Sequence, residues 1–131
     1  MRAARWLVVV AVLAVNGAMG GCGGGSSYGG GLVDPCPTGS IEIQVAPSGL
    51  AFSPTNRTGV RPGDTVCWNF RADGHDVTSG APCTADGDFA TAGVQPAGRA
   101  FTHVFAAAGT FQYFCSVHCG MGMTGTVTVA P

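Results

Sequence analysis

Near its C-terminus the chain reads Tyr113-Phe-Cys-Ser-Val-His-Cys-Gly-Met-Gly-Met123, and a histidine, His75, stands about forty positions upstream. Cys115, His118 and Met123 therefore fall within one short loop, and His75 adds a second imidazole from a distant part of the chain. If the fold brings the two regions together, they form one site with two nitrogen and two sulfur ligands. The rest of the sequence is consistent with a fold that does this.

The strands expected around this loop are short and alternate apolar with polar residues, as half-buried strands do. Turn residues such as those in Arg61-Pro-Gly-Asp64 separate them, and residues 79–96 are too irregular to assign. No segment shows helical periodicity, so about a hundred residues are predicted to form a β-sandwich or small barrel. The expected strands are Ile41–Val45, Leu50–Phe52, Thr65–Phe70, Phe101–Phe105, Phe111–Phe114 and Met123–Val129. The expected aromatic core is Phe52, Trp68, Phe70, Phe101, Phe105, Phe111 and Phe114.

Two imidazoles, a thiolate and a weak thioether are the ligand set of a blue-copper electron-transfer site. Soft sulfur favours Cu(I) and imidazole nitrogen suits Cu(II), so the set accommodates both valences. A structural zinc site prefers four strong nitrogen or sulfur ligands, and a second ligand pair for zinc is missing here. No side chain is placed as a catalytic acid or base, so we expect an electron carrier and no enzyme.

The segment Cys115–Met123 resembles the ligand loop of plastocyanin and pseudoazurin, members of the cupredoxin family. In that loop a histidine follows the cysteine by three residues and a methionine follows the histidine by five. Ala108–Tyr113 and Pro62–Trp68 resemble the strands that precede the two ligand regions. The resemblance covers roughly residues 41–129 and implies an all-β Greek-key β-sandwich or barrel of the cupredoxin type.

Carried over by position, the resemblance makes His75, Cys115 and His118 the equatorial copper ligands and Met123 the axial ligand. It also implies that electrons leave through the ring edge of His118 and that redox proteins dock there transiently. Gly120, Met121 and Gly122 would surround that edge with small or apolar side chains.

Other interpretations remain open at this point. Met121 is a competing axial ligand, because amicyanin-like loops place their methionine three residues after the histidine. Cys115 and Cys119 have the spacing of a binuclear copper site, although such sites carry a histidine where this chain has Met123. His103 lies two positions from both Phe101 and Phe105 in an expected strand, so its side chain should point to the same face as these two core residues. We therefore expect a half-buried, hydrogen-bonded structural histidine there. Copper storage or delivery is the alternative function, and a small copper enzyme with an open coordination position is a third.

Two residues depart from the family pattern. Many cupredoxins carry Asn after the first histidine ligand, and this chain has Asp76, whose charge would disfavour reduction if it lies near the thiolate. Cys119 lies beside His118, where plastocyanins usually have another residue. A disulfide from Cys119 would make the loop more rigid.

The cysteine count predicts two disulfides. With Cys22 lipidated and Cys115 on the metal, four cysteines remain, and four allow three pairings. We favour Cys83–Cys119, which would join the two ligand loops, and Cys36–Cys67, which would tie the N-terminal part to a central strand. Spacing alone does not choose between the pairings.

The N-terminus predicts export. A basic start and an apolar run of roughly ten residues resemble a signal peptide, and Met19-Gly-Gly-Cys22 resembles a lipobox. We expect a signal peptide at 1–21, a Gly/Ser-rich tether at 22–35 and a cupredoxin domain at 36–131. Ordinary secretion is the alternative to a lipid anchor at Cys22, and either places the protein in the periplasm or cell envelope.

The charge balance argues against nucleic acid as a partner. Without residues 1–21 the chain has four arginines, seven acidic residues and no lysine, which gives a formal charge of −3. There is no basic stripe that could follow a phosphate backbone. We expect a monomer that contacts the membrane only through its anchor.

Overall fold

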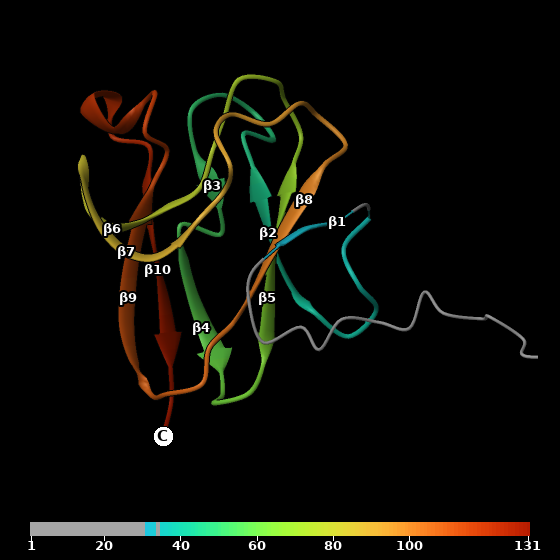
Figure 1. The fold of residues 1–131 in the computed structure, drawn as a ribbon, viewed down its shortest axis with the longest axis vertical. Coiled ribbons are helices and arrows are strands. Elements are labelled where there is room, and N and C mark those ends of the chain that lie inside the picture. Colours follow the sequence, from blue (N-terminus) through green and yellow to red (C-terminus); the bar gives the residue numbers. More distant parts are fainter. Residues whose placement is uncertain (1–30, 34) are drawn as a thin grey trace, which may run out of the picture.

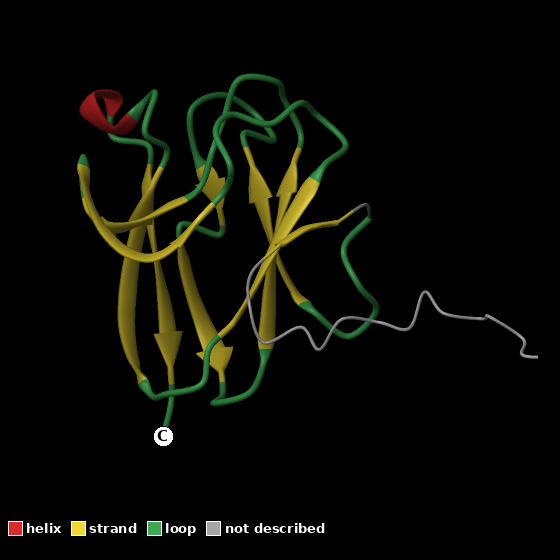
Figure 2. Cartoon of the chain, in the orientation of Figure 1, coloured by secondary structure: helices red, strands yellow, loops and turns green. Residues whose placement is uncertain are grey.

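The computed structural model describes residues 31–33 and 35–131, which form two β-sheets packed face to face (Figures 1 and 2). A single turn of 3-10 helix, η1, interrupts the strand pattern near the C-terminus. The strands are β1 Gly31–Val33, β2 Ile41–Val45, β3 Phe52–Ser53, β4 Asn56–Val60, β5 Thr65–Phe70, β6 Thr78–Ala81, β7 Thr84–Ala90, β8 Ala100–Val104, β9 Gly109–Phe114 and β10 Thr124–Val129; η1 is Cys119–Met121.

Each sheet has five strands. The first sheet has the order β1-β8-β5-β2-β3 and the second has the order β4-β10-β9-β6-β7. The pairs β2–β5 and β4–β10 are parallel, and the other neighbours are antiparallel. The chain crosses from one sheet to the other after β3, β4, β5, β7 and β8, and the two-sheet arrangement confirms the all-β sandwich of the cupredoxin type.

The core lies between the sheets and is built around Trp68. Its ring packs edge-on against Tyr113 at a centroid distance of 5.3 Å, and against Phe89 and Phe101 at 5.4 and 5.7 Å. In β5 the buried Trp68 and Phe70 point to one face, as the alternation of the strand predicts. Phe111 is only partly buried, so its predicted place in the core is correct only in part.

Four strands were not predicted: β1, β4, β6 and β7. β4 lacks apolar alternation, and in β7 only Phe89 is buried, because β7 forms the outer edge of its sheet. Backbone hydrogen bonds with a neighbouring strand form these elements, and such bonds leave little trace in side-chain hydrophobicity. The irregular region 79–96 therefore contains most of a β-hairpin, β6–β7.

A short strand lies within the predicted tether 22–35. β1, inside the expected tether 22–35, pairs with β8 through Leu32 and Phe101, so the sheet begins before residue 36. Leu32 packs against the core, which explains the pairing. The signal peptide at 1–21 and the anchor residue Cys22 lie outside the described residues.

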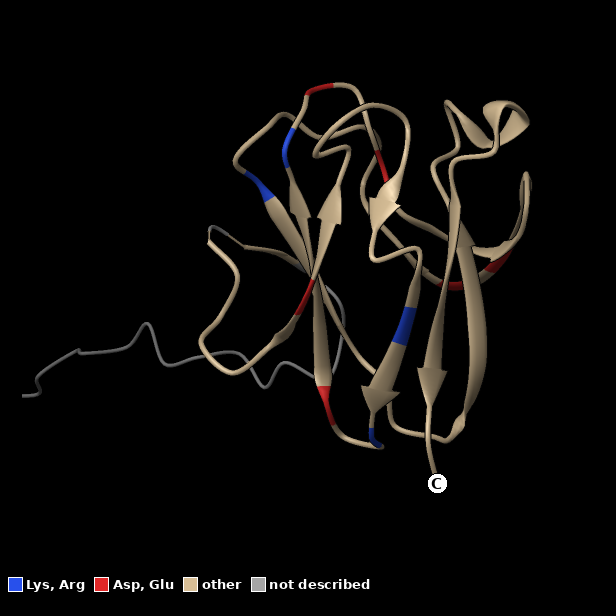
Figure 3. Ribbon diagram, turned by 180° about the vertical axis from the view of Figure 1, so that it is seen from behind, with Lys and Arg blue, Asp and Glu red and all other residues tan. Residues whose placement is uncertain are grey.

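Both predicted disulfides are present. Cys36 is bonded to Cys67 of β5, and Cys83 in the β6–β7 turn is bonded to Cys119 of η1. Charged side chains are few and dispersed over strands and loops (Figure 3). Nowhere in residues 31–33 and 35–131 is there a helix with the length and apolar character needed to span a membrane.

Candidate metal centre

Strand pairing brings the two predicted ligand regions together at one end of the sandwich. β9 ends at Phe114, directly before Cys115, and Phe114 lies opposite Thr78 of β6. His75 precedes Thr78 in the loop that joins β5 to β6. Sheet register therefore places His75 beside Cys115 although forty positions separate them.

Three ligand atoms converge at this end. The Sγ of Cys115 lies 3.8 Å from Nδ1 of His75 and 3.5 Å from Nδ1 of His118. The three ligand atoms all lie within 4.8 Å of one another, and the two imidazole rings are 4.8 Å apart between centroids. Each histidine thus turns the same ring nitrogen toward the sulfur, which leaves the opposite edge of each ring free for other contacts.

The backbone around His75 is fixed by a short bridge to the neighbouring loop. The N–H of Gln95 donates to the carbonyl of His75 at 2.7 Å, and the N–H of Gly74 donates to the carbonyl of Gln95 at 3.1 Å. His75 and Gln95 are both buried. Sequence reasoning missed Gln95, because its role depends on backbone groups that every residue carries.

Met123 is buried and its backbone is hydrogen-bonded to two of the converging residues, whereas Met121 is exposed. Met123 is fully buried; its carbonyl accepts from the N–H of Cys115 at 3.0 Å, and its N–H donates to the carbonyl of His118 at 3.3 Å. Met121 is 66% exposed at the end of η1. Of the two competing methionines, only Met123 is buried.

Burial favours the neutral forms of Cys115 and His75 through their pKa values. Burial raises the pKa of the Cys115 thiol; N–H groups of Asp76, Val117 and His118 that point at the sulfur lower that pKa, and the Asp76 charge raises it. Burial also lowers the pKa of His75, as does the nearby His118, while Asp76 acts in the opposite direction. Neutral imidazole is the form that binds a metal.

A carboxylate links the two ligand regions. Oδ1 of Asp76 accepts a hydrogen bond from the N–H of Ser116 at 2.6 Å, and Oδ2 forms a short hydrogen bond with the Ser116 hydroxyl. Asp76 follows His75 directly and Ser116 follows Cys115 directly. The sequence singled out Asp76 but gave no signal for Ser116.

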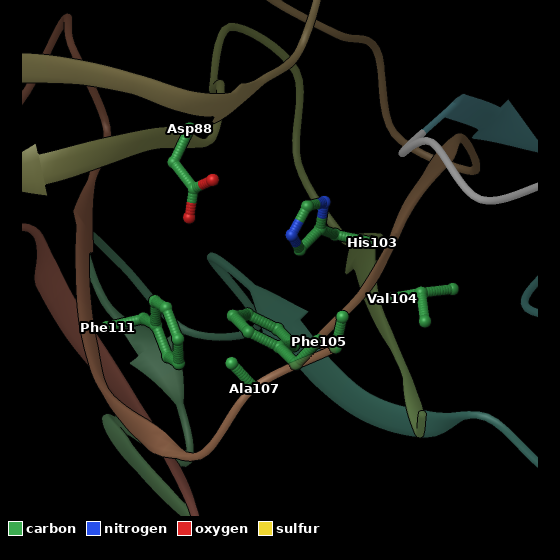
Figure 4. A pocket seen from close by; sticks show the side chains of 7 residues that line it. Asp88, His103, Val104, Phe105, Ala107 and Phe111 are labelled. Carbon is green, nitrogen blue, oxygen red and sulfur yellow. The ribbon is translucent and has the colours of Figure 1, made fainter. Parts of the chain in front are cut away.

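His103 lies away from the ligand cluster, as predicted. It belongs to β8, stacks on Phe89 at 4.6 Å and contacts Phe105 edge-on at 4.8 Å. Together with Asp88, Val104, Phe105, Ala106, Ala107 and Phe111 it lines a surface pocket (Figure 4). It is half-buried, and its buried Nδ1 has no hydrogen-bond partner, so this ring nitrogen does not supply the expected hydrogen bond. The aromatic packing fixes the ring instead.

The residues present fit a copper ion. Cys115 is a fully buried thiol, and among the described cysteines it alone takes no part in a disulfide. One sulfur and two imidazole nitrogens surround a common point, with a buried thioether residue on the same loop. Imidazole with thiolate and thioether is a copper donor set, whereas a closed zinc site would need a fourth strong ligand.

Comparison with known proteins identifies relatives of this arrangement. Residues 39–130 match the sequence model of the copper binding proteins of the plastocyanin/azurin family. A plastocyanin from Scenedesmus fuscus is 33% identical over 100 residues, which are 69% of this chain and 97% of that protein. A plastocyanin from Nostoc punctiforme is 35% identical over 91 residues, 61% of this chain and 65% of that protein. The structure of an oxidised amicyanin mutant superposes with a TM-score of 0.61 at 26% identity, covering 80% of this chain and 95% of that one.

Proposed function

The chain belongs to the plastocyanin/azurin family of copper-binding proteins and binds one copper ion, and we propose that it is a one-electron carrier with His75, Cys115, His118 and Met123 as the copper ligands. The observation that carries the proposal is the convergence of Nδ1 of His75 and Nδ1 of His118 on the sulfur of Cys115. Bound copper supplies the one-electron couple.

The protein's part is to hold the ligands in a fixed arrangement for both valences. β9 and β10 flank the ligand loop, the Gln95 bridge holds the His75 backbone, and the Cys83–Cys119 disulfide holds the residue after His118. Cys115 and Met123 are fully buried, so water is kept from the sulfur ligands. A rigid, dry site favours electron transfer over substrate turnover, so we propose no enzymatic reaction.

His118 is the ligand through which electrons would pass. It is partly exposed, whereas His75 is buried. Val117 and Met121 flank it with side chains that are 52% and 66% exposed. A small apolar surface of this kind suits brief docking, because it gives contact area without a demanding set of polar pairs. Redox proteins are therefore the proposed partners, with the protein itself monomeric.

We also propose that the protein works in the periplasm or cell envelope, held by a lipid at Cys22 after removal of residues 1–21. Two disulfides in the folded domain support an oxidising compartment. Replacement of Cys22 by Ala would release the protein from the membrane fraction if Cys22 carries the lipid. An unchanged membrane fraction would rule the lipid anchor out.

The copper proposal is tested by visible absorption and voltammetry of the copper-loaded protein. Thiolate ligation gives Cu(II) an intense visible absorption, and a fixed ligand set gives a reversible one-electron wave. A colourless Cu(II) protein would exclude Cys115 as a ligand. A coloured protein that loses copper rapidly to a chelator and gives no reversible wave would instead favour storage or delivery.

A further inference from the structure

We propose that the surface pocket between β7, β8 and β9 is a binding site for a small organic cation, in which an ammonium group is joined to a flat apolar body. None of the residues that line this pocket belongs to the cluster of copper ligands. The inference therefore goes beyond the proposed electron-carrier function and does not depend on it.

Residues from both sheets form the pocket. Asp88 belongs to β7 of the second sheet, His103 and Val104 belong to β8 of the first sheet, and Phe111 belongs to β9. Residues 105–107, which connect β8 to β9, complete the lining. The volume of the pocket is 280 Å³, close to the lower limit of about 300 Å³ for pockets that hold small molecules. The ligand is therefore a small one.

Aromatic rings form one side of the pocket. The rings of Phe105 and Phe111 lie 4.9 Å apart between centroids at an interplanar angle of 53°, and Figure 4 shows both of them beneath Asp88 and His103. Phe111 is only partly buried, so the core does not cover the whole residue. The ring of His103 is held by stacking on Phe89 at 4.6 Å. Aromatic faces attract a flat apolar group, and they also attract a cation.

The pocket also contains a negative charge that no basic side chain neutralises. Asp88 is exposed, and Figure 4 shows its carboxylate directed toward the space between His103 and Phe111. None of the lining residues is an arginine or a lysine. The single ion pair in the part of the chain that the structure describes lies elsewhere. The carboxylate is thus available to pair with a cation that enters the pocket.

His103 does not compensate this charge at neutral pH. Burial lowers the pKa of His103, and the charge of Asp88 opposes that shift only in part. The imidazole is therefore neutral at neutral pH, and the pocket has a net negative charge. A cation with a flat apolar body complements both the acid and the rings, whereas an anion would be repelled by Asp88.

An NMR titration of the Cu(I)-loaded protein with benzylammonium chloride tests the location of the site. Benzylammonium joins one aromatic ring to one ammonium group, and Cu(I) is diamagnetic, so the protein signals stay sharp. At neutral pH and constant ionic strength, we expect saturable shifts of the backbone amides of Asp88, His103 and Ala107, and none around His118. The metal-free protein should give the same shifts, so this result is independent of the copper proposal. No saturable shift, or shifts confined to the ligand loop, would overturn the inference.

The role of the charge is tested with Asp88→Asn and a neutral probe. Benzyl alcohol is close to benzylammonium in size but has no charge. The wild type should bind benzylammonium roughly threefold to fivefold more tightly than benzyl alcohol, the range expected for an ion pair exposed to solvent. In Asp88→Asn the two probes should bind equally, because the pair that distinguishes them is gone. Equal affinities in the wild type, or an unchanged ratio in Asp88→Asn, would overturn the role of the charge.

Asp73→Asn is the matched control for net charge. Asp73 does not line the pocket, and the amide oxygen of the variant can still accept from the N–H of Ala97, as the carboxylate does at 2.7 Å. The ratio of the two affinities should stay at the wild-type value. A ratio that falls as far as in Asp88→Asn would show that the preference reflects only the net charge of the protein and would overturn the pairing with Asp88.

Occupation of the pocket itself is tested with Ala107→Leu. Ala107 is exposed and lines the pocket from the β8–β9 connection, so a larger side chain there should fill the space without disturbing the core. Both probes should fail to bind at concentrations that saturate the wild type. Ala97→Leu, at an exposed position outside the pocket, is the control and should bind both probes normally. With folding of both variants checked by thermal unfolding, wild-type affinity in Ala107→Leu would overturn the assignment of the site to this pocket.

Discussion

Cys119, the residue directly after His118, is bonded through its sulfur to Cys83 in the turn of the β6–β7 hairpin, with the two Cα atoms 5.5 Å apart. β6 pairs with β9 only through Thr78 and Ser79, so strand pairing does not hold the turn against the rest of the sheet. The disulfide is thus the covalent connection between this turn and the metal-binding loop. It gives the hairpin a role at the metal site although it contributes no ligand.

Removal of this disulfide should destabilise the protein and loosen the copper site. The bond closes a loop with a sequence separation of 36, for which chain entropy predicts a loss of about 3–4 kcal/mol in the free energy of unfolding. We expect the double variant Cys83→Ala, Cys119→Ala to unfold at lower temperature and to lose copper faster to a chelator.

The second disulfide provides the control for that experiment. Cys36–Cys67 has a similar separation, 31, and lies on the other sheet. The variant Cys36→Ala, Cys67→Ala should lose similar stability but keep a wild-type rate of copper loss under native conditions. Equal rates of copper loss in the two double variants would show that Cys83–Cys119 has no specific effect on the ligand loop.

The two methionines of the ligand loop should respond differently to substitution. Met123 is fully buried and Met121 is mostly exposed. Met123→Leu keeps the volume and removes the thioether, so the visible spectrum and the reduction potential should change. Met121→Leu should leave the spectrum unchanged. A spectrum altered only by Met121→Leu would make Met121 the axial ligand and reverse the assignment.

The ligand set could be predicted from the sequence because its chemistry depends on rare residue types at fixed spacing. Cys115, His118 and Met123 lie on one loop, and the expected strands on either side of it made their approach to His75 foreseeable. Ser116 and Gln95 could not be predicted in the same way. Their contribution is a backbone group or an ordinary polar side chain, which has no distinctive pattern in a single sequence.

The fold was predictable where the strands bury one face. β2 and β5 alternate, and their buried residues, such as Ile43 and Trp68, appear in the core. β4 and β7 were missed because most of their side chains are exposed or partly exposed. Whether such a segment becomes a strand depends on the free hydrogen-bonding edge beside it, which is a property of the assembled sheet.

Gly125→Ala should destabilise the sheet next to the metal loop. Gly125 lies opposite Tyr113 in the β9–β10 pair, and an added Cβ would lie 2.4 Å from the Cζ and the Oη of that buried ring. Displacing the ring should cost about 1–3 kcal/mol, measurable by thermal or denaturant unfolding. Gly120→Ala, where an added Cβ meets no atom within 4 Å, is the control and should stay within about 0.5 kcal/mol of wild type. Equal stabilities of the two variants would contradict the close approach of Gly125 to Tyr113.

His103 should make the stability of the metal-free protein depend on pH without affecting the copper site. Burial lowers the pKa of His103, and Asp88 opposes that shift only in part. Below about pH 6.5 the unfolded state therefore binds more protons at this histidine than the folded state does, so the stability of the protein falls as the pH falls. Above that pH the histidine has no such effect on stability. His103→Gln should lose less stability than wild type between pH 7.5 and pH 5.5 in denaturant titrations, and its copper form should keep the wild-type colour. An identical pH dependence would contradict the effect of burial, and loss of colour would overturn the ligand assignment.

Cys115→Ser should abolish the colour of the Cu(II) protein while the sandwich still folds. Serine is close to cysteine in size, and Cys115 takes part in no disulfide that would hold the domain together. Circular dichroism should show wild-type β-structure, and the visible spectrum should be empty. A variant that is still coloured would show that another residue supplies the sulfur.

The most direct test of the copper site is a crystal structure of the copper-loaded protein with anomalous scattering measured at the copper edge. We expect one anomalous peak within bonding distance of Sγ of Cys115 and Nδ1 of both His75 and His118, with the Met123 thioether as a more distant fourth neighbour. A peak beside His103, two peaks near Cys115 and Cys119, or a Cys115 sulfur held in a disulfide would contradict it.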